Sequence, residues 1–332
     1  MSPIREQLES IFAAAVSAVD PRAAILRQCR RDDHRLVLAG TAIDLGTVGR
    51  IVVVGAGKAA APMAQGIEDV LGDRLDIGVV VTKHGHRLPL ARIRLLEAGH
   101  PVPDEASVRG AAAVLEAVAG LDASDLVIVL LSGGASALLA APRDGLTLAD
   151  KQAATSLLLA SGADITEMNT LRKKLSRVKG GQLARACAPA RVVTLAVSDV
   201  LGDDWAVIGS GPTSPDPTTF VDAMRVCLRY DLLPRLPAAV TGVIERGAAG
   251  IEDDTPDSGD PCFNRGSRHL IASNAQAIAA AAAAARALGY DAVVWDRPLV
   301  GEAALAAEEF CARIDELSSG GRRTCLIAGG ET

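Results

Sequence analysis

The residues that could do chemistry occur in four short stretches, each directly after a run of apolar residues. The first stretch is GAGKAA at 55–60, which fits the pattern G-x-G-x-x-A at a predicted strand-to-helix turn. Glycines such as Gly55 and Gly57 let the backbone approach a phosphate, and the following helix N-terminus supplies N–H donors and positive potential. Lys58 lies within the turn, where its ammonium group can reach the same phosphate. A tight turn with a solvated lysine is the alternative interpretation.

The same pattern is shared with dinucleotide-binding folds, so NAD is a second candidate ligand for the turn at 55–60. In such folds the second strand is followed by an acidic residue that holds the ribose. Here the second apolar run ends in Thr82, Lys83 and His84, with no acid. The missing acid and the lysine within the turn together favour phosphate binding over NAD.

The second stretch is SGGAS at 132–136, directly after an apolar run. Its two glycines, Gly133 and Gly134, and its two hydroxyls, on Ser132 and Ser136, precede a predicted helix. Such a turn can form a small anion cradle from backbone N–H groups. A glycine turn that a serine caps is the alternative.

The third stretch, MNTLRKKLSRVKGGQLA at 168–184, gathers basic residues on what is predicted to be one helix with no compensating acid. It begins with Asn169 and closes at a pair of glycines. In a chain of formal net charge −6, such a run could hold an anionic substrate or a triphosphate. An exposed basic face is the alternative. The basic residues are Arg172, Lys173, Lys174, Arg177 and Lys179.

The fourth stretch, SDVLGDDW at 198–205, begins with Ser198 and carries Asp199, Asp203 and Asp204 after an apolar run. Carboxylates at a strand end are the ligands that Mg²⁺ prefers beside substrate phosphates. An aspartate there could also orient or deprotonate an attacking hydroxyl. Aspartates of turns and helix caps are the alternative, most of all for Asp204.

Other familiar catalytic patterns do not occur in the sequence. It has no G-x-S-x-G elbow, and no G-x-x-x-x-G-K-[ST] motif, so any kinase activity would lie outside the P-loop class. His84, His86 and His100 lack metal-ligand spacing and are predicted to be hydrogen-bonding residues of loops or core.

The composition of the chain restricts the kinds of partner that we expect it to bind. Aromatic residues make up 2% of the 332 residues and the net charge is −6, which argues against nucleic acid as a partner. The N-terminus lacks an apolar signal segment, and the longest apolar run, at 277–285, is too short to span a bilayer. The six cysteines are scattered, which is typical of reduced thiols. We therefore expect a cytoplasmic protein that has no membrane partner.

Alternating strand and helix patterns must position the four stretches. Continuous Val, Ile and Leu runs indicate strands buried on both faces of a parallel sheet. The predicted fold is a doubly wound, mostly parallel Rossmann-like α/β sheet, which binds ligands beyond the carboxyl ends of its strands. The strand runs lie at 50–57, 76–85, 125–134, 191–200, 269–274, 291–296 and 324–330, and the helical stretches at 4–19, 21–31, 59–71, 104–118, 148–159, 220–230, 275–288 and 303–317.

The chain is predicted to contain two domains. Residues 1–245 form the first, and residues 246–267, rich in Gly, Asp and Pro, form a linker or long surface loop. A second, smaller α/β domain begins at 268 and is incomplete at 332, because no crossover follows the last strand run. We expect its open edge to be mobile or to pair with a second copy, as in a homodimer.

Seven motifs follow one another along the chain: VVGAGKAA, TKHGH, AGHPVPDE, LLSGGASALL, EMNTLRKKLSRVKGGQLA, SDVLGDD and GSGPTSPD. In this order they resemble the type II glycerate 2-kinases, the MOFRL family, from about residue 4 to the final GGET. The resemblance implies two α/β domains with the active site in the cleft between them. It also implies transfer of the γ-phosphoryl group of ATP, with Mg²⁺, to the 2-hydroxyl of D-glycerate. Lys58 matches the family's catalytic lysine, and an arginine past GGET would supply a second active-site residue.

In the predicted mechanism, Lys58 neutralises charge on the transferring phosphoryl group, while Asp199, with Asp203, holds Mg²⁺ or orients the hydroxyl. Which loop takes ATP and which takes D-glycerate stays open, and without the missing segment we expect little activity. The alternatives are an NAD(P)-dependent hydroxypyruvate or 2-hydroxyacid reductase and a non-catalytic sugar-phosphate-binding module. The residues predicted to bind nucleotide or substrate are Gly55, Gly57, Ser132, Gly133, Gly134, Ser136, Asn169, Arg172, Lys173, Lys179 and Ser198.

Overall fold

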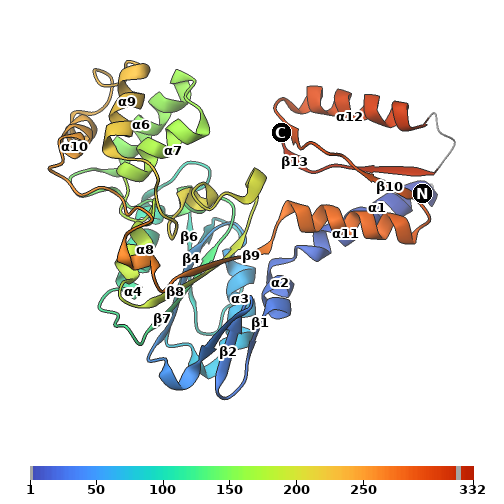
Figure 1. Ribbon diagram of the computed structural model, residues 1–332, viewed down its shortest axis with the longest axis horizontal. Helices are drawn as coiled ribbons and strands as arrows, with labels where there is room; N and C mark the ends of the chain where they lie inside the picture. The colour runs from blue at the N-terminus through green and yellow to red at the C-terminus, as the bar shows by residue number, and fades with distance from the viewer. Residues whose placement is uncertain (1–2, 319–322) are drawn as a thin grey trace.

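The structure, a computed structural model, describes residues 3–318 and 323–332. Its centre is a sheet of six parallel strands in the order β6-β5-β4-β7-β8-β9 (Figure 1). Counted within the sheet, this is the order 3-2-1-4-5-6 that is usual for a Rossmann fold, so the predicted fold class is confirmed. The strands are β4 (Ile51–Ala56), β5 (Ile77–Lys83), β6 (Arg94–Ala98), β7 (Leu126–Leu131), β8 (Arg191–Val197) and β9 (Ser267–Ala272).

Helices follow most strands, and side chains and glycines cap their ends. Thr147 and Asp150 form a capping box before α6, and Gly162 ends that helix in the left-handed conformation. Asp20 caps α2, whose first residue is Pro21. Within the described ranges, no helix is long and apolar enough to cross a membrane. The α-helices are α1 (Pro3–Ala18), α2 (Pro21–Gln28), α3 (Ala60–Leu71), α4 (Glu105–Ala117), α5 (Ala135–Leu138), α6 (Leu148–Ser161), α7 (Ile165–Lys174), α8 (Gln182–Cys187), α9 (Phe220–Arg229), α10 (Ala238–Ala248), α11 (Asn274–Ala287) and α12 (Ala303–Ser318).

Both faces of the sheet are covered, because alternate residues of a strand point to opposite sides. Val52 of β4 packs in one hydrophobic cluster with Val114 of α4. Its neighbour Val53 packs in the other cluster with Ile67 of α3. Every residue of β4 and β7 is buried, which explains why these strands appear in the sequence as continuous apolar runs.

A small antiparallel sheet near the N-terminus was not among the predicted elements. The helical pattern at 21–31 ends early, because α2 stops at Gln28 and the chain continues into β1 (Cys29–Arg31). This strand pairs with β2 (Arg35–Leu38), which in turn pairs with β3 (Thr41–Asp44). Both leucines of β2 are fully buried, so pairing as strands brings them into the same core as α2 and α3.

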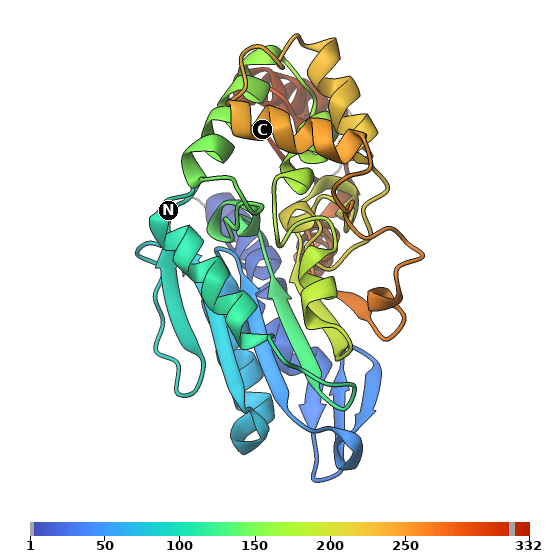
Figure 2. The same ribbon diagram turned by 90° about the vertical axis from the view of Figure 1, so that its left-hand side faces the viewer.

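Four helices, α6, α7, α9 and α10, form a separate helical unit with its own hydrophobic core. That core includes Leu158, Leu171, Phe220 and Val243, each from a different helix of the unit. Figure 2 shows the unit above the sheet, at the end of the molecule away from the small antiparallel sheet. The α6–α7 part is inserted between β7 and β8, so it extends the loop that follows β7.

The boundary between the predicted domains differs in the structure. The strand β9 pairs with β8 in the central sheet, so its residues belong there rather than to a second domain that begins at 268. The loop before β9 packs back on its neighbours instead of linking two units. Glu252 pairs with Arg143 at 2.7 Å, and Asp260 pairs with Arg185 at 2.9 Å. Sequence alone could not assign β9, because an apolar run carries no mark of the sheet that it joins.

The rest of the chain forms a C-terminal unit of α1, α11, α12 and β10–β13. Two parallel pairs build it: β10 (Asp291–Val294) with β12 (Thr324–Ile327), and β11 (Leu299–Val300) with β13 (Gly330–Glu331). The first helix of the chain, α1, packs against α11 through Ile11 (Figure 1). The unit thus joins segments from both ends of the sequence; that it is an incomplete domain stays a prediction.

Candidate active site

The switch point of the central sheet lies between β4 and β7, where the strand order reverses. Ligands of open α/β sheets bind at such a point, in the crevice beyond the carboxyl ends of the strands. The turn after β4 carries Gly57 and Lys58, and the turn after β7 carries Ser132, Gly133 and Gly134. The fold therefore brings the first two predicted stretches side by side.

The two turns are bound to each other. The backbone N–H of Lys58 donates to the Gly133 carbonyl at 2.8 Å, and the N–H of Ala59 donates to Oγ of Ser132 at 3.0 Å. Gly57 has a φ of +143°, and a Cβ there would lie 1.9 Å from Oγ of Ser132, so only glycine fits. The Ser132 hydroxyl thus fixes the turn that carries Lys58.

Opposite charges face each other beside these turns. Nζ of Lys58 lies 3.9 Å from Oδ2 of Asp199, which follows β8, and both side chains are about half exposed. A Cβ on Gly133 would lie 1.9 Å from the same oxygen, so the carboxylate rests directly against the turn. Burial, and then the charges of Lys58 and Lys83, lower the pKa of His100, which lies against the next glycine. We call the following residues the switch-point cluster: Gly57, Lys58, His100, Ser132, Gly133, Gly134 and Asp199.

One carboxylate, rather than a cage of ligands, is available for a metal ion here. In residues 3–318 and 323–332, no three His, Cys, Asp or Glu side chains gather where they could hold a metal ion. Asp199 borders the glycine turns, which fits Mg²⁺ that is held mainly by substrate phosphates. Asp203 lies in a 3-10 turn four residues on, and its role as a ligand stays a prediction. Ser198 accepts a hydrogen bond from the N–H of Val200 at 3.2 Å, so it shapes the turn that carries Asp199.

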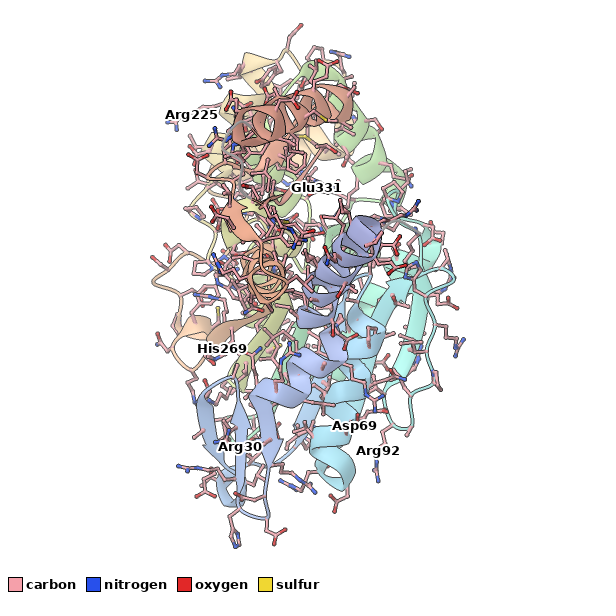
Figure 3. All side chains as sticks on the ribbon, turned by 90° about the vertical axis from the view of Figure 1, so that its right-hand side faces the viewer. Arg30, Asp69, Arg92, Arg225, His269 and Glu331 are labelled. Carbon is pink, nitrogen blue, oxygen red and sulfur yellow. The ribbon has the colours of Figure 1, made fainter. Side chains whose placement is uncertain are left out.

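A cavity of about 820 Å³ adjoins the switch-point cluster. Its walls include α5, which follows Gly134, and the loop 101–103, which follows His100, together with α6 and α7. Figure 3 labels Glu331, which β13 of the C-terminal unit contributes to the lining. We call this the cationic cavity, because its charged lining residues are Lys151, Arg172, Lys179 and Glu331.

Burial governs the charge of the lysines in the cationic cavity. Nζ of Lys179 donates to the Ser136 carbonyl at 2.6 Å, and burial, followed by the charges of Lys151 and Arg172, holds its pKa well below the usual value. Burial, with Arg172 adding to the effect, lowers the pKa of Lys151 to about 7. Among the described residues, Nζ of Lys151 is the one buried side-chain nitrogen or oxygen without a hydrogen-bond partner. In the sequence, Lys151 is a single lysine within a helical stretch, so nothing there marked it as a candidate site residue.

The basic stretch at 168–184 is not one helix, and part of its charge is compensated. The helix α7 ends at Lys174, and α8 begins eight residues later. Lys173 and Lys174 pair with Asp216 at 3.3 and 3.1 Å, and Lys174 also pairs with Asp254 at 2.5 Å. The prediction of one helix without compensating acids is therefore wrong. Relative to Lys174, the acids lie 42 and 80 residues further along the chain, where no local pattern reveals them.

Two further predicted residues meet through a serine that the sequence analysis did not single out. Ser210 donates from Oγ to Oδ1 of Asn169 at 3.1 Å, and its Oγ lies 3.0 Å from Oγ of Ser136. These bonds tie α7 to α5 beside the cationic cavity. Ser210 belongs to the GSGPTSPD motif, and this was the one feature of the sequence that could have marked it as a site residue. Gly55, by contrast, lies inside β4 rather than in the turn that follows this strand.

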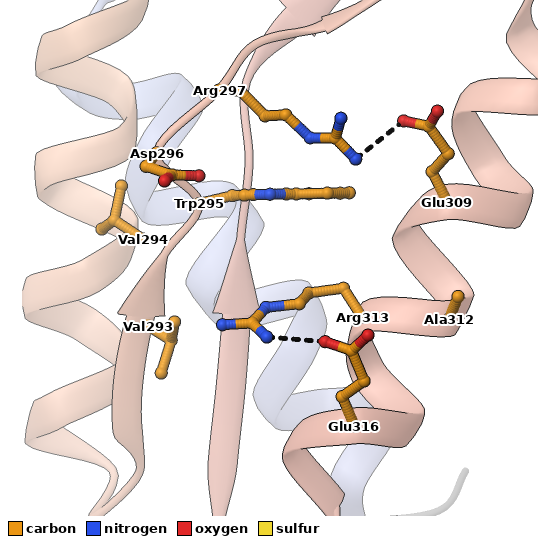
Figure 4. Close-up of a pocket in the computed structure, with 9 residues that line it drawn as sticks. All are labelled: Val293, Val294, Trp295, Asp296, Arg297, Glu309, Ala312, Arg313 and Glu316. Atoms are coloured by element: carbon orange, nitrogen blue, oxygen red, sulfur yellow. Dashed lines mark hydrogen bonds and ion pairs between the residues drawn. The ribbon is translucent and has the colours of Figure 1, made fainter.

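A second hollow, of about 540 Å³, lies in the C-terminal unit. Figure 4 shows Arg297 over the ring of Trp295, 4.9 Å from its centre, and paired with Glu309 at 3.0 Å. Arg313 pairs with Glu316 at 2.6 Å in the same hollow. Because each arginine is matched by a carboxylate, this hollow is a weaker candidate for an anion site than the cationic cavity.

Fold and cluster together define a Rossmann-like α/β protein that carries a lysine, a glycine turn and an aspartate at the switch point of its sheet. Residues 7–245 match the family described as a domain of unknown function, DUF4147. The chain belongs to this family, which is of the glycerate kinase or MOFRL type that its motifs resemble.

Named relatives agree with this assignment. The glycerate 2-kinase of Pyrococcus horikoshii is 40% identical over 333 aligned residues, which cover 99% of this chain and 74% of that protein. A protein of Agrobacterium vitis, provisionally named a hydroxypyruvate reductase, is 44% identical; the chain spans 63% of its length, and the match covers 90% of this chain. The crystal structure of a glycerate kinase from Thermotoga maritima superposes with a TM-score of 0.84 at 35% identity, covering all of this chain and 75% of that one.

Proposed function

We propose that this protein is a glycerate 2-kinase, which transfers the γ-phosphoryl group of ATP to the 2-hydroxyl of D-glycerate. Family membership and the names of the Pyrococcus and Thermotoga relatives support the reaction. The observation that carries the proposal is the meeting of Lys58 with the turn of Ser132, Gly133 and Gly134 at the switch point. Cytoplasmic location and a homodimer remain predictions from the sequence.

The switch-point cluster suits phosphoryl transfer, in which positioning and charge stabilisation do most of the work. The ammonium group of Lys58 can neutralise charge on the equatorial oxygens of the transferring group. The glycines of the two turns let Ser132 and Asp199 approach the backbone closely, which holds both side chains beside Lys58. Asp199, 3.9 Å from Lys58, can accept a hydrogen bond from the attacking hydroxyl or hold Mg²⁺. When bound, Mg²⁺ would supply further positive charge to the phosphates.

The reductase name of the Agrobacterium relative raises a competing function, but the site favours it less. An NAD enzyme of this fold would hold the ribose with an acid after the second strand of the sheet. Here that strand, β5, ends at Lys83 and is followed by His84. The ammonium group of Lys83 cannot accept a hydrogen bond from a ribose hydroxyl, and Nε2 of His84 is already engaged with Oδ2 of Asp104 at 2.9 Å.

The test is turnover with the purified protein. With ATP, Mg²⁺ and D-glycerate we expect ADP release, and 2-phosphoglycerate detected by an enolase-coupled assay. Lys58→Ala should lower kcat about 100-fold or more with a smaller change in KM, because the lost charge acts mainly in the transition state. Arg225→Ala is the control, since it removes an exposed positive charge from α9. NADH oxidation with hydroxypyruvate and no ADP release with D-glycerate would overturn the proposal.

A further inference from the structure

Lys151 is the unexplained residue of the cationic cavity. It projects from α6, a helix of 14 residues, and its side chain is buried without a hydrogen-bond partner. A buried ammonium group without a partner is costly for a folded chain. The other buried lysines each have acceptors: Lys173 and Lys174 bind Asp216, and Lys179 binds the Ser136 carbonyl. Lys151 therefore has the unmet charge that a bound anion would satisfy.

The balance of charge in the cavity calls for an anion with several charges. Lys151, Arg172 and Lys179 line it, and Glu331 is the one acid among its lining residues within the described ranges. Arg172 and Lys179 come from the basic stretch that the sequence analysis marked as a candidate for a triphosphate. Burial suppresses the charge of Lys151 and Lys179 in the free protein, and an anion with several charges could restore it on both while also pairing with Arg172.

The size and walls of the cavity point to a ligand larger than a three-carbon acid. Its volume of about 820 Å³ is typical of sites that bind drug-sized or nucleotide-sized molecules. Leu159, Ile165 and Met168 line the part that α6 and α7 form. Leu159 is 64% exposed and Ile165 is 55% exposed, so apolar surface is available for a planar base.

We propose that the cationic cavity binds the nucleotide, with its polyphosphate against Lys151, Arg172 and Lys179, and that Lys151 is a nucleotide-binding residue. This rests on the proposed kinase function and assigns ATP to the cavity and D-glycerate to the switch-point cluster. The two sites adjoin through α5, because Ser136 borders the cavity and Gly134 borders Lys58. A polyphosphate in the cavity can thus extend its end towards Lys58.

The test is calorimetric titration of ADP, and of inorganic triphosphate, into the protein and its variants. Lys151→Met should weaken ADP binding about 10- to 100-fold, as expected for loss of a charge-assisted bond. Lys151→Arg should retain most of the affinity, and the control Arg225→Met should match the wild type. Thermal melting verifies that each variant is folded. Inorganic triphosphate should follow the same order, since the polyphosphate carries the contact.

A second readout separates a binding role from a structural one. At pH 8, ADP binding to the wild type should take up protons, measured in buffers of different ionisation heat, because the anion restores the charge that burial suppresses on Lys151. The other groups that face Lys151 are Arg172, Lys179 and Glu331. Lys151→Met should reduce the uptake.

Unchanged ADP affinity in folded Lys151→Met would overturn the inference. So would a raised KM for D-glycerate with unchanged ADP affinity, which would assign the cavity to the acid. Either result leaves the kinase proposal standing, because that depends on ADP release by the wild type. Proton uptake that Lys151→Met does not alter would also count against Lys151.

Discussion

Replacing Lys174 by methionine should destabilise the protein by about 3 kcal/mol, although the residue lies outside both candidate sites. Its side chain is fully buried. Its ammonium group contacts Oδ2 of Asp216 at 3.1 Å, the carbonyl of Thr218 at 2.5 Å, Oδ1 of Asp254 at 2.5 Å and Oγ1 of Thr255 at 2.5 Å. One side chain thus joins the end of α7 to two loops from later in the sequence.

The magnitude follows from what the substitution leaves behind. Removing one partner of a buried ion pair costs about 3–5 kcal/mol, because the other charge stays buried without compensation. Asp216 would keep Lys173 at 3.3 Å, and Asp254 is 36% exposed and can turn to water. Both facts place the loss at the lower end of that range. Methionine has a similar length, so little packing is lost.

Urea unfolding followed by circular dichroism would measure the loss. Arg177→Met is the matched control, because Arg177 and its partner Asp144 are 53% and 88% exposed, and exposed pairs contribute about 0–1 kcal/mol. Burial alone would raise the pKa of Asp216, but Lys174 and then Lys173 hold it below the usual 3.8. The stabilisation is therefore present above pH 3.8 and lost as the pH falls further, so the difference between wild type and variant should be constant from about pH 5 to 8. Equal losses for the two variants would refute the reasoning.

Three further substitutions test other contacts. Gly133→Ala would place a Cβ 1.9 Å from Oδ2 of Asp199, so kcat should fall about tenfold or more while the melting temperature changes little; wild-type kcat would show that the carboxylate moves freely. Lys151→Met should raise the melting temperature of the ligand-free protein, because burial lowers the pKa of that lysine from 10.5 to about 7. The gain should be largest below pH 7 and fade as the pH rises to 10.5, so scanning fluorimetry at pH 6 and 9 would check it, and a lower melting temperature at pH 6 would contradict it. Ser210→Ala should cost about 1–3 kcal/mol in urea unfolding, because Asn169 loses its donor, and an unchanged midpoint would mean that water replaces it.

The sequence predicted the structure well where the local geometry accepts only one kind of residue. The turn at Gly57 needs glycine because of its φ and its close approach to Ser132, and both residues stand out in short motifs. Strands buried on both faces need continuous apolar runs, so five of the six strands of the central sheet were predicted, whereas the edge strand β6, which is only partly buried, was missed. The capping box before α6 likewise depends on residues only three positions apart, Thr147 and Asp150.

Sequence was uninformative where residues far apart in the chain decide the outcome. Asp216 and Asp254 neutralise Lys174 from distant loops, so the basic stretch looked uncompensated. Lys151 stands alone in an ordinary helical pattern, and its importance comes from burial among other cations. The small sheet of β1–β3 was missed because its strands are only three or four residues long. In addition, α2 passes directly into β1, with no glycine or proline between them to mark the end of the helix.

The packing of α1 on α11 has a consequence for synthesis on the ribosome. Ile11 leaves the ribosome early, but its partner Ala281 is translated about 270 residues later. At about 5–20 residues per second, this is a wait of roughly 15–50 s. Throughout that time the apolar side of α1 has no native partner, while the central sheet can already assemble from β4 to β8. Although α1 is made long before α11, it is among the last helices to gain its native partner, so chaperones that bind nascent apolar segments have a long time in which to bind it.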